Sequence, residues 1–226
     1  MTRLVLFDID GTLIRTGGAG VKAFAKVFET EFRTRDGFEK LKFAGRTDFS
    51  LMREFFSFHQ IPPSPENFKR FTDSYVFWLD YILHHTQGEV CAGAREFLSD
   101  LKALPRPPLL GLLTGNIRLG AEIKLRYFHL WDEFATGAFA DDHENRDEIA
   151  AVARERGARL LKEDLGPEQV LVIGDTPFDI RCARAIGARV LAVGTGGGTM
   201  DELEAHRPDC LVADLTKANL SEIIAQ

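Results

Sequence analysis

The chain has 226 residues, of which 45% are hydrophobic and 27% are charged, and this size is enough for an α/β core with a second, smaller unit. Its net charge of −6 gives no indication of a nucleic-acid or membrane partner. We expect a cytoplasmic protein, because the chain has no apolar run long enough to span a bilayer and no room for a signal peptide before its first apolar run. Its three cysteines are widely separated and suggest neither disulfides nor a zinc site. The sequence leaves the oligomeric state open.

The first predicted element is a buried strand at Leu4–Phe7, which runs directly into Asp8-Ile9-Asp10-Gly11-Thr12. In open parallel sheets, ligands bind beyond the carboxyl ends of the strands, so both carboxylates are expected at a ligand site. Like charges this close favour a hard cation such as Mg²⁺, which prefers oxygen ligands. An Asp-Gly pair after a strand is also a common turn, so the segment alone leaves an ordinary turn open.

Residues 16–86 are predicted to form a helical insertion, because apolar residues such as Phe24 and Phe28 recur at helical spacing. Within it, residues 43–48 form a polar loop led by Gly45. The expected division is therefore an α/β core at 1–15 and 87–226 and a helical unit at 16–86.

A second buried strand is predicted at Leu109–Leu113, followed by Thr114-Gly115-Asn116 and a helix at 117–125. Such a junction suits an anion, because the first N–H groups of a helix have no partner within the helix and its dipole favours negative charge. The alternative is that Asn116 only caps the helix.

A short strand at 134–138 precedes the charged loop 141–148. Most of these charges are expected to be solvated, or to favour the start of the next helix. A site that holds several acids and a phosphate nevertheless needs a cation besides the metal, and Arg146 is the best-placed candidate.

A further strand at 169–173 leads into Gly174-Asp175-Thr176-Pro177-Phe178-Asp179. Thr176 and Asp179 have the spacing of a capping box, which gives Asp179 a structural role, whereas Asp175 has none and is the expected metal ligand. Asp179 is expected to orient a neighbouring cation. The strand at Arg189–Val193, a glycine-rich connection, the helix at Met200–Ala205 and a strand at 210–213 complete an α/β, Rossmann-like parallel sheet with helices on both faces.

In this order, the segments resemble the haloacid dehalogenase superfamily, in particular its phosphoglycolate phosphatase-like branch with a helical cap. The resemblance covers nearly the whole chain. Its four motifs match Asp8 to Thr12, then Thr114, then Arg146, and finally Gly174-Asp175 with Asp179. Arg146 departs from the lysine usual in the third motif, and residues 158–164 are interpreted as a short insertion before the last catalytic strand.

The resemblance implies that Asp8 is the nucleophile that forms an aspartyl-phosphate and that Asp10 is the general acid and base. Mg²⁺ is expected to be bound by Asp8, the backbone carbonyl of Asp10, and Asp175. Thr114 and Arg146 also count as catalytic. The residues expected to hold the phosphoryl group are Thr12, Thr114, Gly115, Asn116 and Arg146.

The resemblance further implies that the insertion is a cap that covers the site and that Arg46 and Thr47 face the leaving group, although Arg46 could instead pair with Asp48 or Glu54. The expected function is a Mg²⁺-dependent phosphatase for a small phosphorylated metabolite, such as phosphoglycolate or a sugar phosphate. A phosphomutase similar to β-phosphoglucomutase is the alternative, and a binding protein without turnover is a third reading. An acid at Asp10 argues against a dehalogenase, while phosphonate hydrolysis through a cap lysine stays open for Lys22, Lys26, Lys40 and Lys42.

Overall fold

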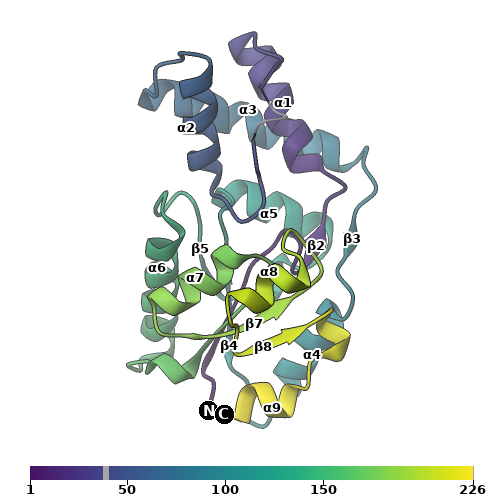
Figure 1. Cartoon of the computed structure of the whole chain (residues 1–226), viewed down its shortest axis with the longest axis vertical. Coiled ribbons are helices and arrows are strands. Elements are labelled where there is room, and N and C mark those ends of the chain that lie inside the picture. The colour runs from purple at the N-terminus through teal and green to yellow at the C-terminus, as the bar shows by residue number, and fades with distance from the viewer. Residues whose placement is uncertain (38–40, 226) are drawn as a thin grey trace.

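Six parallel strands form the central sheet of the computed structural model, which describes residues 1–37 and 41–225 (Figure 1). The strand order is β5-β4-β1-β6-β7-β8, and each neighbouring pair is parallel. This confirms the predicted α/β fold class. The strands are β1 (Leu4–Phe7), β4 (Leu109–Leu113), β5 (Thr136–Ala138), β6 (Val170–Gly174), β7 (Arg189–Val193) and β8 (Cys210–Val212).

The central strand β1 is buried on both faces, as expected for a parallel strand covered by helices on both sides. Val5 and Phe7 belong to one hydrophobic cluster and Leu4 and Leu6 to the other, because side chains alternate along a strand. The first cluster includes residues of α4 (Ala94–Ala103), α5 (Arg118–Tyr127) and α9 (Leu220–Ala225), and the second includes residues of α6 (Arg146–Leu161), α7 (Pro177–Ala185) and α8 (Met200–Ala205).

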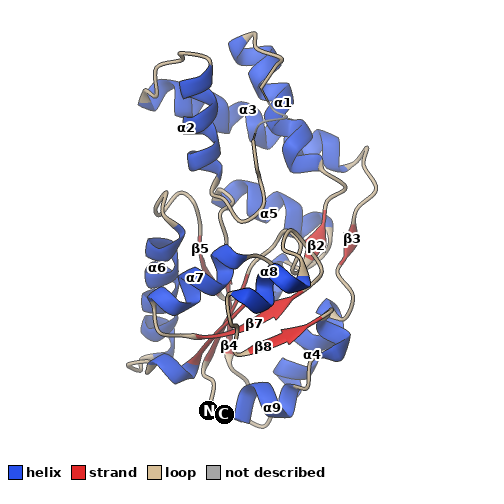
Figure 2. Ribbon diagram, in the orientation of Figure 1, coloured by secondary structure: helices blue, strands red, loops and turns tan. Residues whose placement is uncertain are grey.

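Three helices form the insertion: α1 (Ala19–Phe32), α2 (Asp48–Phe58) and α3 (Pro65–Leu83). They lie beyond one end of the sheet (Figure 2). Their shared core is strongly aromatic and includes Phe24, Phe28, Phe55, Phe71 and Tyr75. Bulky rings allow a small helical unit to bury enough apolar surface. The predicted helical character of this segment is therefore confirmed, while its division from the core as a separate domain stays a prediction.

The insertion joins the sheet through a short ladder of two antiparallel strands, β2 (Ile14–Arg15) and β3 (Glu89–Val90). Ile14 pairs with Val90, and Arg15 pairs with Glu89. The two connections between the insertion and the core therefore run side by side.

Several predicted boundaries differ from the structure. The helix expected at 117–125 spans Arg118–Tyr127, and the strand expected at 134–138 begins only at Thr136, after a 3₁₀ helix at Trp131–Glu133. Residues 158–161 are the last turn of α6, so that part of the segment interpreted as an insertion extends a regular helix.

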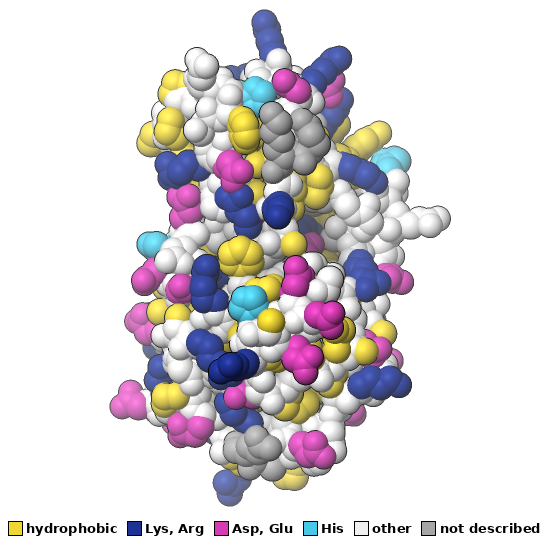
Figure 3. Space-filling view, viewed as in Figure 1, with side chains coloured by type: hydrophobic (Ala, Val, Ile, Leu, Met, Phe, Trp, Pro, Cys, Tyr) yellow, Lys and Arg dark blue, Asp and Glu magenta, His cyan; other side chains and the backbone are white. Residues whose placement is uncertain are grey.

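Among the described residues, no helix combines the length and the hydrophobicity needed to cross a membrane. Acidic and basic side chains are interspersed over the visible face of the molecule (Figure 3). The cytoplasmic location expected from the sequence stays a prediction.

Candidate active site

A cavity of about 510 Å³ lies where the carboxyl ends of β1, β4 and β6 face the insertion. Asp8, Thr114 and Asp175, one from the end of each of these strands, all line it. Their convergence follows from the topology, because β4 and β6 are the two neighbours of β1 in the sheet. Other predicted site residues that line the cavity are Asp10, Arg46, Gly115, Asn116 and Arg146.

Three buried carboxylates lie close together, and two of them, Asp8 and Asp175, line this cavity. Asp8, Asp175 and Asp179 each offer an oxygen atom, and these atoms lie within 4.8 Å of one another. Burial raises the pKa of Asp8 to about 6, and burial together with the charges of Asp179 and Asp8 raises the pKa of Asp175 well above its usual value. This concentration of negative charge in a buried place fits a divalent cation with oxygen ligands.

Arg146 is the cation that the structure places beside Asp8. It is the first residue of α6, and its side chain turns back so that Nη2 lies 3.0 Å from Oδ1 of Asp8 and also pairs with Asp179. The other terminal nitrogen, Nη1, donates to the carbonyl oxygen of Gly45 at 3.2 Å. One buried guanidinium therefore contacts the acid cluster and a loop of the insertion at the same time.

The remaining contacts of the acid cluster hold its members in place. Thr12 Oγ1 donates to Asp175 Oδ1 at 3.1 Å, and the backbone N–H of Gly197 donates to Oδ2 at 2.6 Å. Thr12 is absent from the residues that line the cavity, so its expected contact with a phosphoryl group stays a prediction and its observed contact is with Asp175. Asp179 Oδ2 accepts from the N–H and the hydroxyl of Thr176, which confirms the predicted capping box.

Asn116 is oriented toward Asp10 and does not cap the helix that follows it. Its Nδ2 lies 2.8 Å from Asp10 Oδ2 and 2.8 Å from Thr114 Oγ1. The N-cap of α5 is Ile117, and the Ile117 N–H is bound by Asp48 Oδ2 of the insertion at 2.8 Å. The alternative in which Asn116 serves as the cap is therefore wrong.

Sequence reasoning missed Lys124, which is 3% exposed and lines the cavity. Its Nζ donates to Asp10 Oδ2 and to Asn116 Oδ1, each at 2.6 Å. Lys124 stands three residues after Ala121 and one before Leu125, on the buried face of α5. A lysine within the apolar stripe of a predicted helix could have indicated a buried cation at this position. Asp48 and Tyr75 also line the cavity and were not singled out as site residues.

The two residues expected to face the leaving group make other contacts. Arg46 pairs with Glu54, as the alternative interpretation allowed, and donates to the carbonyl of Ser50 at 3.3 Å. Thr47 caps α2 and donates its hydroxyl to the carbonyl of Glu144 at 2.8 Å. Thr47 therefore fastens the loop to the core and is absent from the cavity lining, so the roles of both residues in specificity stay predictions.

The lysines considered for phosphonate chemistry are also accounted for. Lys22 donates to the carbonyl of Gly17, Lys26 pairs with Glu29, and Lys42 lies outside the cavity lining. Lys40 falls outside the described residues. Within the part of the chain that the structure describes, Lys124 is therefore the lysine that lines the cavity, and it belongs to the core.

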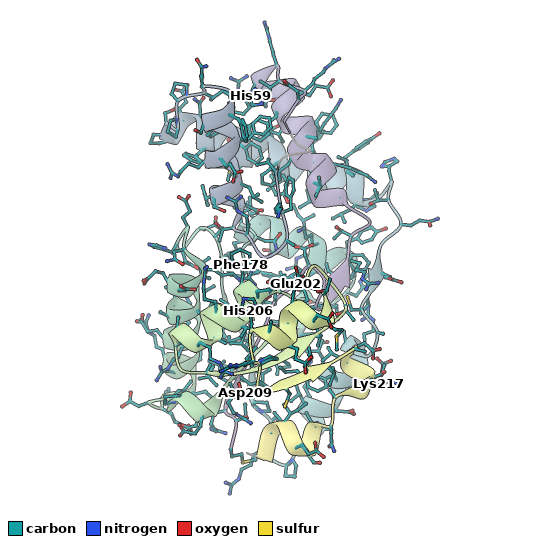
Figure 4. The ribbon with its side chains drawn as sticks, viewed as in Figure 1. His59, Phe178, Glu202, His206, Asp209 and Lys217 are labelled. Atoms are coloured by element: carbon teal, nitrogen blue, oxygen red, sulfur yellow. The ribbon has the colours of Figure 1, made fainter. Side chains whose placement is uncertain are left out.

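Loop 43–48 of the insertion rests directly on the core. The Asp48 N–H donates to the carbonyl of Gly115 at 2.7 Å, and a Cβ atom on Gly115 would lie 2.2 Å from the carbonyl oxygen of Arg46. Phe178, where α7 approaches the insertion, lies against Gly45 of the same loop (Figure 4). The cavity is thus covered by the insertion in this structure.

Comparisons with known proteins agree with this arrangement. A family model described as haloacid dehalogenase-like hydrolase matches residues 5–193. The chain is 26% identical over 194 residues to the bifunctional riboflavin kinase/FMN phosphatase of Arabidopsis thaliana, covering 85% of this chain and 48% of that protein, so it spans about half of that relative. It is 25% identical over 227 residues to a protein of Clostridium perfringens that carries the name pyrophosphatase PpaX, with 94% and 93% covered. The structure of CbbY from Rhodobacter sphaeroides in complex with phosphate superposes with a TM-score of 0.77 at 19% identity, covering 100% of both chains, which supports the fold.

Proposed function

The chain belongs to the haloacid dehalogenase-like hydrolases and is a phosphatase of that superfamily, and on this premise we propose that it hydrolyses a small phosphate monoester through an aspartyl-phosphate on Asp8. The observation that carries the proposal is the position of Asp8. Asp8 is 5% exposed, its carboxylate stands beside Arg146, and it shares the cavity with Asp10 and Asp175. A nucleophile, a proton carrier and an anion-binding cation are therefore within one covered space.

In the first half-reaction, a carboxylate oxygen of Asp8 would attack phosphorus while the bond from phosphorus to the leaving oxygen breaks. Asp10 would give its proton to that oxygen, so the alcohol leaves uncharged. In the second half-reaction, water would attack the aspartyl-phosphate while Asp10 takes its proton. Phosphate would then depart and Asp8 would return to its starting state.

The phosphoryl oxygens need donors throughout this sequence. Arg146 would bind them from the side of α6, and Thr114 with the backbone N–H of Gly115 would bind them from the end of β4. Asn116 contacts both Thr114 and Asp10, so it would hold the proton carrier next to the phosphoryl site.

Mg²⁺ is the proposed cofactor, and Asp8, the backbone carbonyl of Asp10, and Asp175 would hold it. When bound, it would supply the positive charge that lets an anionic ester approach a carboxylate. The fit rests on the buried cluster of Asp8, Asp175 and Asp179, in which Arg146 pairs with Asp8 and Asp179.

The test is a phosphate-release assay across small phosphate esters, with and without Mg²⁺. We expect Mg²⁺-dependent release, complete loss in Asp8→Asn, and slow turnover with accumulated phosphoprotein in Asp10→Asn. Asp73→Asn, an identical change on the exposed side of α3, is the matched control and is expected to match the wild type. Release that persists in Asp8→Asn would refute the proposal.

A phosphomutase remains the second candidate, because the same aspartyl-phosphate can pass to another hydroxyl of a sugar instead of to water. Product analysis separates the two activities. A phosphatase yields free phosphate in equal amount to the alcohol, whereas a mutase yields an isomeric sugar phosphate with little free phosphate.

A further inference from the structure

We infer that Asp48, Tyr75 and Lys124 bind the alcohol part of the substrate and select an uncharged, hydroxyl-bearing alcohol over a carboxylated one. The inference rests on the proposed phosphatase function, and it names the substrate class that the sequence left open. The three residues come from α2, α3 and α5, and all line the cavity that also holds Asp8 and Asp10.

The first support is that Tyr75 and Asp48 have polar atoms available to a ligand in the cavity. Tyr75 is 1% exposed, and its hydroxyl has no hydrogen-bond partner among the described residues. Asp48 is 7% exposed, and only its Oδ2 is bonded, to the N–H of Ile117. Neither the Tyr75 hydroxyl nor Asp48 Oδ1 is among the buried side-chain atoms that lack a partner in the described residues, so each is accessible from the cavity and can bond to a ligand there.

The second support is the spacing of Tyr75 and Lys124 around Gly20 of α1. An atom at the position of a Cβ on Gly20 would lie 3.5 Å from Lys124 Nζ and 3.6 Å from the Tyr75 hydroxyl. A glycine therefore leaves open a space that one phenol and one ammonium flank. A substrate hydroxyl can accept from Lys124 and bond to Tyr75 at the same time, since a hydroxyl both donates and accepts.

The third support is that every cation facing the cavity already has an acidic partner. Among the described residues, these cations are Arg46, Lys124 and Arg146. Arg46 pairs with Glu54, Lys124 with Asp10, and Arg146 with Asp8 and Asp179. A substrate carboxylate at this end of the cavity would find no unpaired cation and would face the acids Asp10 and Asp48, which is unfavourable for a buried charge.

The surrounding walls fit a carbon skeleton of moderate size. Val21, Phe24, Phe43 and Leu51 line the same cavity and present apolar surface. A polyol or sugar has C–H groups that can pack on these walls and hydroxyls that can bond to Asp48, Tyr75 and Lys124. Phosphoglycolate has a carboxylate next to its phosphate ester, a single CH₂ group and no hydroxyl.

The experiment compares kcat/KM for sorbitol 6-phosphate, glycerol 3-phosphate, phosphoglycolate and p-nitrophenyl phosphate. The aryl ester reports on the catalytic machinery, so its hydrolysis tests the proposed function independently of this inference. We expect the wild type to prefer the two polyol esters over phosphoglycolate. An enzyme that cleaves the aryl ester yet prefers phosphoglycolate, or cleaves neither polyol ester, overturns the inference and leaves the phosphatase function intact.

Two substitutions test the residues themselves. Tyr75→Phe removes one hydroxyl and is expected to lower the ratio of kcat/KM for sorbitol 6-phosphate to that for the aryl ester by about tenfold. Tyr81→Phe makes the same change on the exposed side of α3 and is expected to leave that ratio as it is. Equal ratios in Tyr75→Phe and Tyr81→Phe would overturn the inference.

Asp48→Asn keeps an acceptor for the Ile117 N–H and removes the charge. We expect the ratio of phosphoglycolate to sorbitol 6-phosphate hydrolysis to rise by about threefold or more. A ratio that stays at the wild-type value in a folded protein, as judged by circular dichroism, would contradict a selective role of Asp48.

Gly20→Ala provides a steric test that does not touch a polar group. Its Cβ would meet its neighbours at ordinary contact distance, so we expect the variant to fold, and alanine favours a helix. The methyl group would occupy the space between Tyr75 and Lys124 and raise KM for sorbitol 6-phosphate more than for the aryl ester. Thr30→Ala, on the exposed end of α1, is the matched control, and equal KM effects in both variants would argue against a substrate hydroxyl at this place.

Discussion

Lys124 Nζ lies 2.6 Å from Asp10 Oδ2, and this contact joins two residues 114 positions apart in the chain. The lysine side chain is 4% exposed, whereas the Asp10 side chain is 42% exposed and reaches into the cavity. Together with the amide of Asn116, the ammonium fixes the orientation of the carboxylate that is proposed to carry the proton.

Lys124→Met is expected to lower kcat by about tenfold or more for alkyl phosphates, because Asp10 loses a donor that orients it. The loss is expected to be smaller for p-nitrophenyl phosphate, whose leaving oxygen needs less help from an acid. Steady-state kinetics with both esters measure this difference, and Lys69→Met on the exposed surface of α3 is the control. A loss of the same size for both esters would show that Lys124 does not act through proton transfer to the leaving group.

Arg146→Lys is expected to retain measurable activity, with kcat reduced about tenfold, whereas Arg146→Ala loses about a hundredfold or more. Lysine keeps the positive charge but has one nitrogen, so it cannot contact Asp8 and the carbonyl of Gly45 as Arg146 does. Phosphate release under saturating ester gives the comparison. Arg159→Lys, on the exposed side of α6, should behave as the wild type.

Mg²⁺ is expected to raise the melting temperature of the wild-type protein, because a ligand that binds only the folded state stabilises it by about 2.7 kcal/mol at a hundred times its Kd. The ion would bind at the cluster of Asp8, Asp175 and Asp179, where its positive charge would offset the negative charge of the carboxylates. Asp175→Asn should abolish the Mg²⁺-dependent shift, and EDTA should reverse it in the wild type. Asp100→Asn on α4 should keep the shift, and loss of the shift in that variant would place the ion elsewhere.

Asp48→Asn is expected to stabilise the protein more strongly as the pH rises. Burial raises the pKa of Asp48 from 3.8 to about 7, so between these values the unfolded chain releases a proton that the folded protein keeps. The free energy of unfolding therefore falls with pH across this window, and the penalty is complete above it. Urea unfolding at about pH 5 and about pH 8 should show a larger advantage of the variant at the higher pH, up to about 4 kcal/mol.

The control for this measurement is Asp73→Asn, whose exposed carboxyl pairs with Lys69. The same gain in both variants, or a gain that is independent of pH, would show that ionisation of Asp48 does not limit stability.

Gly115→Ala is expected to separate loop 43–48 from the core, because the new Cβ would lie 2.2 Å from the carbonyl oxygen of Arg46 and backbone atoms cannot move aside cheaply. We expect faster tryptic cleavage after Arg46 and a lower kcat. Gly166→Ala, where the nearest atom belongs to the flexible side chain of Glu168, is the control. Unchanged cleavage of the Gly115 variant would mean that the loop tolerates the methyl group.

The parts of the fold that the sequence predicted well are those with a local signal. Buried parallel strands appear as uninterrupted apolar runs, and the acids that follow them stand at fixed offsets from their ends, so Asp8 and Asp175 could be placed at one edge of the sheet. The capping box of Thr176 and Asp179 is likewise a pattern of neighbouring residues, and the structure confirms it.

The partners of these residues were harder to predict, because they depend on how the insertion lies on the core. Asp48 of the insertion accepts from the N–H of Ile117 at the start of α5, where the sequence left a helix cap by Asn116 open as an alternative. The Thr12 hydroxyl donates to Asp175, and the Arg46 guanidinium pairs with Glu54. In the sequence, Lys124 is one of several basic residues of a predicted helix, and only the fold places it beside Asp10.

The paired strands β2 and β3 have a mechanical consequence. Since both connections between the insertion and the core pass through one narrow ribbon, a swing of the three helices would pivot about it, and the displacement would grow with distance from the ribbon. Loop 43–48 contacts the core where Arg146 donates to the Gly45 carbonyl, so a small rotation about the ribbon would carry Gly45 away from Arg146 and open a path for product to diffuse out.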